Sequence, residues 1–192
     1  CPSATALHSA STLLAGSNVS IAGQNCSAHK TGAFTGQLSA TDLASAGARY
    51  CIIGHSECRK DGFESSDTVA EKMLRVLEAN MTPIICIGET LREFEENKTC
   101  QALDAQLEPI IKALTSNAQQ EVSPAHPEPV EGRPAKDERA GQQIVIAYEP
   151  IWAIGSGKVP TPEILETCFS FLAKKTTAPT LNITLLYGGS VS

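Results

Sequence analysis

The sequence predicts an α/β fold in which parallel strands alternate with helices, and three observations lead to it. Five short apolar runs rich in β-branched residues recur at positions 19–22, 50–53, 83–87, 144–147 and 183–186. These runs are almost continuously apolar, which is typical of parallel strands covered on both faces. Stretches with helical periodicity lie between them. This alternation leaves two architectures, a doubly wound sheet and a (β/α)8 barrel.

The expected helices cover an opening segment, 4–14, and the periodic apolar stretches 69–77, 103–114 and 164–172. Thr68 and Glu71 fit a capping box at the start of the second helix. Thr161, followed by a proline, fits an N-cap with a first-turn proline at the start of the last helix. Pro109 is expected to bend or break the third helix, because proline has no backbone N–H to donate.

The spacing of the strand runs isolates one segment that does not fit the repeat. The runs start 31, 33, 61 and 39 residues apart, and a unit of roughly thirty residues or slightly more explains all but the third interval. The surplus lies at residues 115–142, which contain four prolines and eight charged residues but no aromatic residue. Such a segment cannot bury enough apolar surface to offset its ordering entropy. We expect a disordered surface insertion within one domain that spans residues 1–192, with a partner-binding segment as the alternative.

The composition excludes several classes of function. Apolar residues make up 42% and charged residues 19% of the chain, and the net charge is −6. No Lys/Arg cluster and no run of 18 apolar residues occurs, so we expect no nucleic-acid or membrane partner. The seven cysteines lack the spacing of a zinc site, and several lie within apolar runs. Buried reduced thiols predict a reducing, cytoplasmic compartment.

Polar side chains follow two of the strand runs. His55 comes after the second run and Glu149 after the fourth. In a parallel barrel the C-terminal ends of the strands face one active-site mouth. An imidazole and a carboxylate brought together there form an acid/base pair. A histidine satisfied by the backbone and a glutamate paired with Arg or Lys are the structural alternatives.

Two loops carry the composition of an anion site. PIWAIGSGK at 150–158 has an apolar tip and glycines, which suits a lid that excludes water and offers N–H groups to an anion. YGGS at 187–190 ends the fifth run with two glycines, which permit close approach of a phosphate. The sequence contains no dinucleotide-binding glycine pattern, and GSGK at 155–158 lacks part of the phosphate-loop motif.

Together these segments resemble the triosephosphate isomerase family. The matching motifs are AYEPIWAIG at 147–155, GHSE at 54–57, YGGSV at 187–191, QN at 24–25 and GAFTG at 32–36. The resemblance covers nearly the whole chain except 115–142. It implies a (β/α)8 TIM barrel, present here in part, with about strands 3–7 and their helices.

The resemblance also implies an activity, the interconversion of dihydroxyacetone phosphate and D-glyceraldehyde 3-phosphate in glycolysis and gluconeogenesis. Glu149 is similar to the base and His55 to the neutral electrophile, a pair of roles for which this family is a standard worked example. Glu57 is similar to a further carboxylate beside the site. No metal and no organic cofactor is implied.

Other residues are implicated in phosphate binding and in assembly. The lid and loop residues that resemble phosphate contacts are Ile154, Gly155, Gly189 and Ser190. Residues 28–35 resemble a protrusion that enters a neighbouring subunit, with Thr35 approaching its active site. The resemblance therefore favours a homodimer, and a plain surface loop is the alternative.

The sequence departs from the family's pattern at both ends and at one internal position. No strand ending in Asn-x-Lys precedes Cys1, and no eighth strand with a glycine pair follows Ser192. Cys58 stands where the family usually has arginine, with Arg59 beside it. We expect a fragment of an enzyme, weakly active or inactive alone. The alternatives are a non-catalytic descendant that acts as an interaction protein and another barrel enzyme that acts on a phosphorylated sugar.

Overall fold

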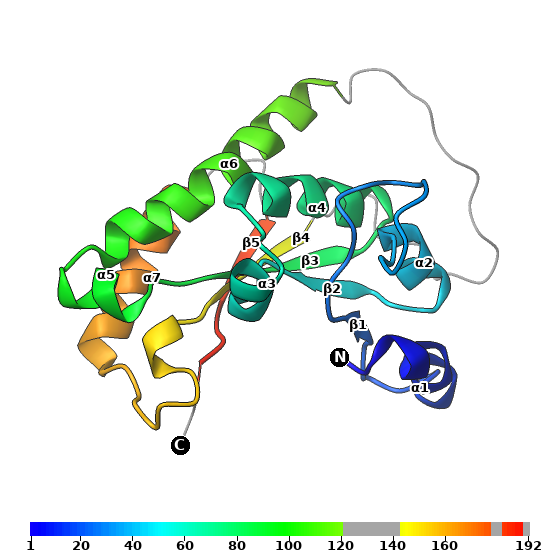
Figure 1. The fold of residues 1–192 in the computed structure, drawn as a ribbon, viewed down its shortest axis with the longest axis horizontal. Coiled ribbons are helices and arrows are strands. Elements are labelled where there is room, and N and C mark those ends of the chain that lie inside the picture. Colours follow the sequence, from blue (N-terminus) through cyan, green and yellow to red (C-terminus); the bar gives the residue numbers. More distant parts are fainter. Residues whose placement is uncertain (121–142, 178–181, 190–192) are drawn as a thin grey trace.

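The computed structural model describes residues 1–120, 143–177 and 182–189, which form a parallel sheet with helices packed against it (Figure 1). The elements are η1 (Ala4–Ala6), α1 (Leu7–Leu13), β1 (Ala22–Gly23), α2 (Ala40–Ser45), β2 (Tyr50–Ile53), α3 (Ser56–Asp61), α4 (Ser66–Glu78), β3 (Thr82–Ile87), α5 (Leu91–Glu95), α6 (Thr99–Gln120), β4 (Gln143–Tyr148), η2 (Ile151–Ala153), α7 (Pro162–Thr176) and β5 (Asn182–Tyr187).

The strands are ordered as they occur in the chain. The five-stranded sheet runs β1-β2-β3-β4-β5, and every neighbouring pair is parallel. A doubly wound sheet reverses its strand order at a switch point, whereas a barrel adds each strand beside the previous one. The order therefore confirms the partial (β/α)8 barrel over the doubly wound alternative.

The helices cover the outer side of this curved sheet. Helix α4 packs on β2 and β3, α6 packs on β3, and α7 packs on β5. Helices α2, α4, α6 and α7 follow one another around that side, each in contact with the next (Figure 1). Met73, Ile85, Leu103, Ile146 and Leu172 are fully buried where these helices meet the strands. This layer fixes the strands whose C-terminal ends carry the polar residues.

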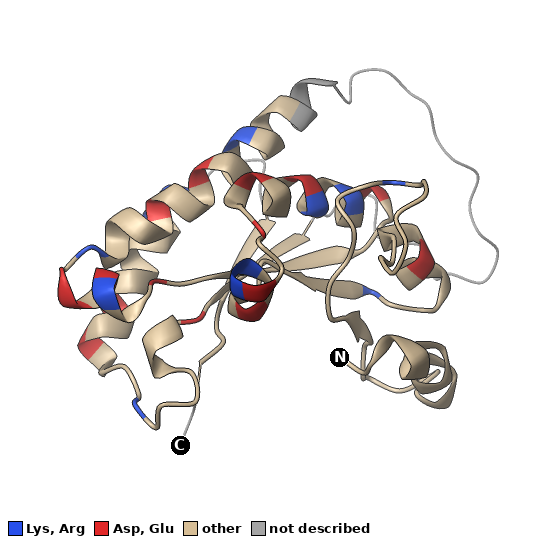
Figure 2. Cartoon of the chain, in the orientation of Figure 1, with Lys and Arg blue, Asp and Glu red and all other residues tan. Residues whose placement is uncertain are grey.

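Charged residues are distributed unequally between the strands and the rest of the described chain. The described strands contain no charged residue, and the Lys, Arg, Asp and Glu side chains lie on helices and connecting loops (Figure 2). Within the described residues, no helix is both long enough and apolar enough to cross a membrane.

Two predicted element starts are wrong. The first strand is Ala22–Gly23 rather than residues 19–22, because Val19 is exposed and only Ala22 and Gly23 pair with β2. Helix α4 is capped by Ser65, whose side chain accepts from the Thr68 N–H, so the expected capping box at Thr68 does not form. The predicted cap of α7 is confirmed, since the Thr161 side chain accepts from the Ile164 N–H.

Helix α6 corrects two expectations. It continues through Pro109 without a break, and Leu107 and Ile110 on either side are buried in the core. Tertiary packing thus offsets the lost hydrogen bond. The helix also includes residues 115–120, which were expected to begin the insertion. The rest of that expected insertion, 121–142, lies outside the described residues.

Candidate active site

The C-terminal ends of the parallel strands bring four chemistry-bearing positions to one edge of the sheet. His55 follows β2, Glu89 follows β3, Glu149 follows β4, and Gly188 follows β5. The β3–β4 and β4–β5 registers align these ends, with Ile87 opposite Tyr148 and Tyr148 opposite Tyr187. The residues predicted at the second and fourth strand ends therefore lie together, as the barrel hypothesis requires.

Glu149 is held by its backbone and buried by its neighbours. Its N–H donates to the Ile87 carbonyl at 2.8 Å, and its side chain is only 12% exposed. Burial raises the pKa of the Glu149 carboxyl, while His55 and a hydrogen bond with the Cys86 thiol lower it. Among the described residues, none makes a hydrogen bond to its buried Oε2 atom. The carboxylate is thus a group of raised basicity with one buried oxygen that accepts no hydrogen bond from the described residues.

His55 has a defined orientation because it also caps a helix. It is the N-cap of α3, and its Nδ1 accepts from the Glu57 N–H at 3.3 Å. An accepting Nδ1 carries no proton, so the neutral ring carries its proton on Nε2. Nε2 lies 3.6 Å from Glu149 Oε2, which is too long for a hydrogen bond but close enough for one substrate to contact both. The pair can offer a donor and a base to the same small molecule.

Glu57 lies beside His55, with most of its carboxylate exposed. Its carboxylate is 83% exposed, and Oε2 lies 3.7 Å from His55 Nδ1. Its backbone N–H rather than its carboxylate determines the His55 tautomer. The structure therefore gives Glu57 a positioning contact through the main chain.

Two glycines create the space that Glu149 occupies. A Cβ atom on Gly188 would lie 2.7 Å from Glu149 Cγ and 2.9 Å from Oε1. A Cβ atom on Gly88 would lie 1.7 Å from the Glu149 carbonyl oxygen. Gln106 fixes Gly88 from the helix side, since its amide accepts from the Gly88 N–H at 3.0 Å and donates to its carbonyl at 2.8 Å. Gly88 and Gln106 are site-supporting residues that the sequence reasoning missed.

Glu89 is a further site residue that the sequence reasoning missed, and it makes more contacts in the site than Gly88 or Gln106. It is completely buried, and its Oε1 accepts from the Tyr148 hydroxyl at 3.1 Å and from Trp152 Nε1 at 2.7 Å. Its carbonyl also accepts from the Ile151 N–H at 3.0 Å. The sequence did contain a signal, because Glu89 follows an apolar strand run as Glu149 does. Glu89 anchors η2, from which the expected lid begins.

The lid expected at 150–158 is exposed only in its second part, because Pro150 and Ala153 are buried at η2. Residues 154–159 are exposed, and Gly155 and Gly157 have φ values of +64° and +72°. Their hydrogen bonds to other described residues reach only two or three positions along the chain, as from the Ser156 hydroxyl to the Ala153 carbonyl at 3.2 Å. Gly189 follows Gly188 after the end of β5, and Ser190 lies outside the described residues. In the part of the chain described, no three His, Cys, Asp or Glu side chains form a metal-binding group.

Comparison with known proteins identifies the family to which this geometry belongs. A family model described as triosephosphate isomerase matches residues 1–192. The chain belongs to the triosephosphate isomerase family. The triosephosphate isomerase of Albidiferax ferrireducens is 34% identical over 195 residues, which cover all of this chain and 70% of that protein. That of Geotalea uraniireducens is 37% identical over 195 residues, 99% of this chain and 69% of that protein.

A solved structure agrees with the sequence relatives. The crystal structure of triosephosphate isomerase from Bartonella henselae superposes with a TM-score of 0.75 and 33% sequence identity. The match covers all of this chain and 69% of the other. The family, the TIM-barrel fold and an isomerase activity are therefore established for this sequence.

At position 58, where the sequence departs from the family pattern, Cys58 and its neighbour Arg59 make different contacts. The Arg59 guanidinium donates to the Gly54 carbonyl at 2.7 Å and to the Cys86 carbonyl at 3.3 Å, which ties the ends of β2 and β3 together. Cys58 instead receives a hydrogen bond from Asn25 Nδ2 at 3.3 Å. Arg59 therefore has a structural task of its own.

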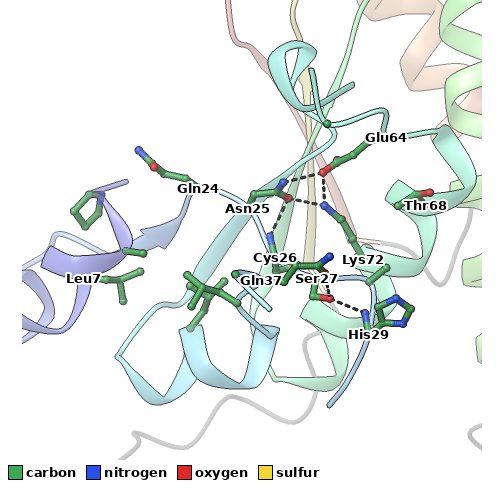
Figure 3. A pocket seen from close by; sticks show the side chains of 17 residues that line it. Leu7, Gln24, Asn25, Cys26, Ser27, His29, Gln37, Glu64, Thr68 and Lys72 are labelled. Carbon is green, nitrogen blue, oxygen red and sulfur yellow. Dashed lines mark hydrogen bonds and ion pairs between the residues drawn. The ribbon is translucent and has the colours of Figure 1, made fainter. Parts of the chain in front are cut away.

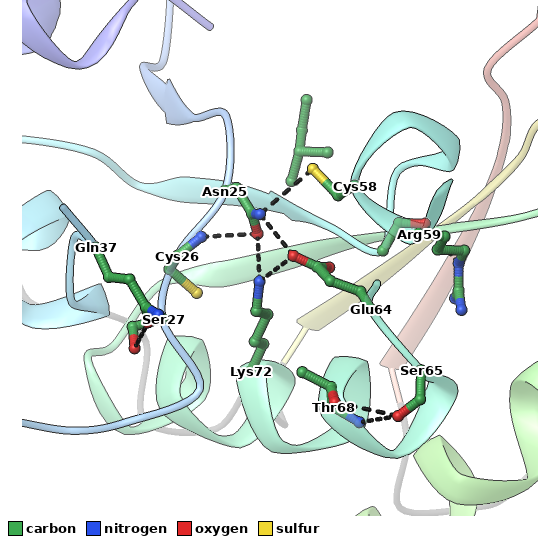
Figure 4. A network of polar contacts seen from close by, with 12 residues as sticks. Asn25, Cys26, Ser27, Gln37, Cys58, Arg59, Glu64, Ser65, Thr68 and Lys72 are labelled. Atoms are coloured by element: carbon green, nitrogen blue, oxygen red, sulfur yellow. Dashed lines mark hydrogen bonds and ion pairs between the residues drawn. The ribbon is translucent and has the colours of Figure 1, made fainter. Parts of the chain in front are cut away.

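The loop between β1 and α2, residues 24–39, contains the expected protrusion 28–35 and is called the third loop below. A buried polar network lies at the root of this loop (Figure 4). Asn25 Nδ2 donates to Glu64 Oε1 at 2.8 Å, and Lys72 Nζ donates to Asn25 Oδ1 at 3.0 Å. Lys72 also pairs with Glu64, and both side chains are only 8% exposed. The Cys26 N–H donates to Asn25 Oδ1 at 2.9 Å. Because a buried charge is tolerated only when it is paired, this network fixes the point at which the third loop leaves the barrel.

Beyond this root the third loop projects outward. The Ser27 N–H donates to the Leu38 carbonyl at 2.8 Å, and the Ser27 hydroxyl donates to Gln37 at 2.6 Å, so the two ends of the loop are joined. Residues 30–38 between them are exposed. A cavity of about 480 Å³ is lined by Ser27 and Gln37 from the joined ends and by Lys72 from the polar network (Figure 3). Thr35 lies on the exposed part, where the family resemblance places a contact with a second subunit.

Proposed function

We propose that the chain interconverts dihydroxyacetone phosphate and D-glyceraldehyde 3-phosphate with Glu149 as the base and His55 as the electrophile. One observation carries the proposal. Glu149 Oε2, which is buried and accepts no hydrogen bond from the described residues, lies 3.6 Å from the His55 Nε2 that carries the ring proton. A base beside a hydrogen-bond donor is what proton abstraction next to a carbonyl requires.

The chemistry then follows from the two groups. Glu149 Oε2 removes the proton from C1 of the ketose, and the electron pair moves to the C2 carbonyl oxygen. The Nε2–H of His55 donates to that oxygen and stabilises the charge that develops on it. Return of the proton from Glu149 to C2, with proton transfer between the two oxygens through His55, completes the isomerisation. The N–H of Glu57 keeps the His55 ring in the tautomer that can donate.

Phosphate binding is assigned to the expected lid and the loop after β5. Ile154 and Gly155 lie in the exposed segment between η2 and α7, and Gly189 lies beside the Gly188 that borders Glu149. Ser190 is included on the family resemblance. Glycine backbone at these positions leaves N–H groups accessible to the phosphate dianion, which supports the assignment.

The proposal also includes a homodimer and a cytoplasmic location. A homodimer through residues 28–35, with Thr35 near the partner's site, is supported by the exposed loop on its fixed root. All seven cysteines are free, which supports a reducing cytoplasm as the compartment. The pathways would be glycolysis and gluconeogenesis.

Solvent exchange tests the function more sensitively than turnover alone. The full chain is incubated with dihydroxyacetone phosphate in deuterated water, and both triose phosphates are analysed for deuterium. We expect deuterium at C1 of the ketose and at C2 of the aldose, because the Glu149 carboxyl exchanges its proton before returning it. Absence of deuterium at both carbons in a chain that still binds the substrate would contradict the proposal and favour the interaction-protein alternative.

A further inference from the structure

A second cavity lies on the helical side of the molecule, away from the His55–Glu149 pair. It has a volume of about 320 Å³ and lies between α5, α6 and α7. Phe94 comes from the first helix, Cys100 from the second, and Ile164 and Cys168 from the third. This volume falls at the lower end of the roughly 300–1,000 Å³ that small-molecule sites occupy.

The lining of the cavity selects an uncharged ligand. Phe94 and Ile164 supply apolar surface, and Cys100 and Cys168 supply two free thiols. Cys100 is partly exposed, whereas Cys168 is buried. Among the described residues that line the cavity, Glu163 carries the one formal charge and would repel an anion. The substrate proposed above is an anion, so this cavity is suited to a different class of molecule.

Two residues that line the cavity, Phe94 on α5 and Cys168 on α7, connect to the same residue, Trp152. Phe94 stacks on the Trp152 ring with the centroids 4.4 Å apart and the planes 26° from parallel. On the opposite wall, Cys168 lies beside the Tyr148 side chain and contributes to raising the pKa of its hydroxyl. That hydroxyl donates to Glu89 Oε1, which also accepts from Trp152 Nε1 at 2.7 Å. Movement of Phe94 therefore acts on Trp152 by direct contact. Movement of Cys168 acts on Trp152 through Tyr148 and Glu89.

The cavity also borders the other end of the expected lid. The exposed segment 154–159 begins just after Trp152 in η2 and ends just before Thr161, the N-cap of α7. Ile164 and Cys168, in the first half of α7, form part of the cavity wall. A molecule in the cavity would thus touch elements on both sides of the segment that has the fewest restraints.

We propose that this cavity is an effector site for uncharged, apolar molecules of about one ring, with Cys100 as the thiol to which a reactive ligand couples. Occupancy changes the packing of Trp152 and, through it, the position of residues 154–159. The consequence for catalysis rests on the proposed function, whereas the consequence for Trp152 does not.

The chain supplies its own reporter for the test. Trp152 is the only tryptophan, so tryptophan emission reports on it alone. The full chain is treated with benzyl methanethiosulfonate. The Cys100 sulfur forms a disulfide with the benzylthio sulfur, the S–S bond of the reagent breaks, methanesulfinate leaves, and the thiol proton goes to water. We expect a shift in the Trp152 emission maximum and a change in kcat/KM. The smaller methyl reagent is expected to give a smaller shift.

Charge selectivity is measured with the anionic sulfonatoethyl reagent, and Cys1, which is exposed, serves as the internal reference for reagent reactivity. We expect the ratio of benzyl to sulfonatoethyl labelling to be higher at Cys100 than at Cys1. The matched control is Cys100→Ser, which should retain activity and show no emission shift with any reagent.

Three results would overturn the inference. They are equal labelling ratios at Cys100 and Cys1, a Cys100 adduct that leaves Trp152 emission unchanged, and equal shifts from the methyl and benzyl adducts. An emission shift in a chain that fails the solvent-exchange test would instead support the effector site while contradicting the proposed function.

Discussion

Glu149 and the exposed segment that begins five residues later differ in how firmly they are held. Glu149 is fixed by a backbone hydrogen bond to Ile87 and by two glycines that leave no room for another atom. Residues 154–159 are exposed and bond only to near neighbours in the part of the chain described. Ideal Cβ atoms at Gly155 and Gly157 would meet nothing within 4 Å. One region is restrained by packing and the other only by backbone geometry.

The difference corresponds to two requirements of the proposed reaction. A base must stay within a fraction of an ångström of its target, since a misplacement of about 1 Å can cost about 100-fold in rate. A lid must open and close, so it belongs to the part of a structure with low local stability. Glu89 joins the two, because it bonds Tyr148 beside the base and Trp152 before the lid. Changes in the two regions should therefore have effects of different size and kind.

The largest effect is expected from Glu149→Gln, which keeps the shape of the side chain and removes its basicity. We expect kcat to fall by at least about 100-fold, the low end for loss of a general base, with little change in substrate affinity. Steady-state kinetics and thermal unfolding measured on the same preparation separate chemistry from folding. A variant that retained half the parent rate would remove Glu149 from the mechanism.

The next effect is expected from Gly188→Ala, which places a methyl group against the base. The new Cβ would lie 2.7 Å from Glu149 Cγ, so the carboxylate must move. We expect kcat/KM to fall by up to about 100-fold, mainly through kcat, because the substrate contacts of the lid are unchanged. Activity within twofold of the parent would show that Glu149 adjusts without losing its geometry.

The sequence identified the residues whose role follows from a local sequence pattern. His55 and Glu149 are polar residues directly after apolar runs, and β2 to β5 have the β-branched composition of buried strands. The role of Gly188 depends on a contact with a residue 39 positions earlier, which no local pattern records. Glu89 matched the same pattern as Glu149, but its burial under Tyr148 and Trp152 required the fold.

The predicted boundaries of helices and strands were wrong where local sequence signals competed with tertiary contacts. Ser65 and Thr68 are both good caps, and the register of α4 in the core selects Ser65. Pro109 is a local helix breaker, but the packing of α6 against α4 and β3 keeps the helix continuous. The edge strand β1 has two residues, whereas the other edge strand of the described sheet, β5, has six.

A smaller effect is expected from Gly155→Ala in the lid. Its φ of +64° lies in the left-handed region, where a side chain costs roughly 1–2 kcal/mol, but the added methyl group would meet no atom. We expect kcat/KM to fall by about tenfold or less, since 1.4 kcal/mol corresponds to a factor of ten. Gly157→Ala, at φ +72°, is the matched control and should behave similarly. A loss larger than that of Gly188→Ala would reverse the comparison between packed and unpacked glycines.

The smallest effect is expected from Glu57→Gln and concerns pH. Burial raises the pKa of Glu149 above the usual carboxyl value of 4.5, and the negative charge of Glu57 adds to that rise. Because the base acts only when ionised, the acid limb of kcat/KM should lie above pH 4.5 in the parent chain. Removing the Glu57 charge should move this limb to lower pH by a fraction of a unit and leave the plateau unchanged.

Salt provides the control for this shift, since the Glu57 carboxylate is 83% exposed and its influence is screened by ions. The acid limbs of the parent and of Glu57→Gln should converge at about 1 M salt, where the Debye length is about 3 Å.

The pH dependence of thermal stability tests the direction of the Glu149 pKa shift independently of the kinetics. A carboxyl whose pKa is raised by folding stabilises the fold below its unfolded pKa and loses that contribution as pH rises through its folded pKa. Glu149→Gln should therefore melt higher than the parent at neutral pH, with the difference shrinking as the pH falls through the raised folded pKa of Glu149 toward 4.5. An acid limb that moves upward in Glu57→Gln, or a melting difference that grows on acidification, would contradict the assignment of the raised pKa to Glu149.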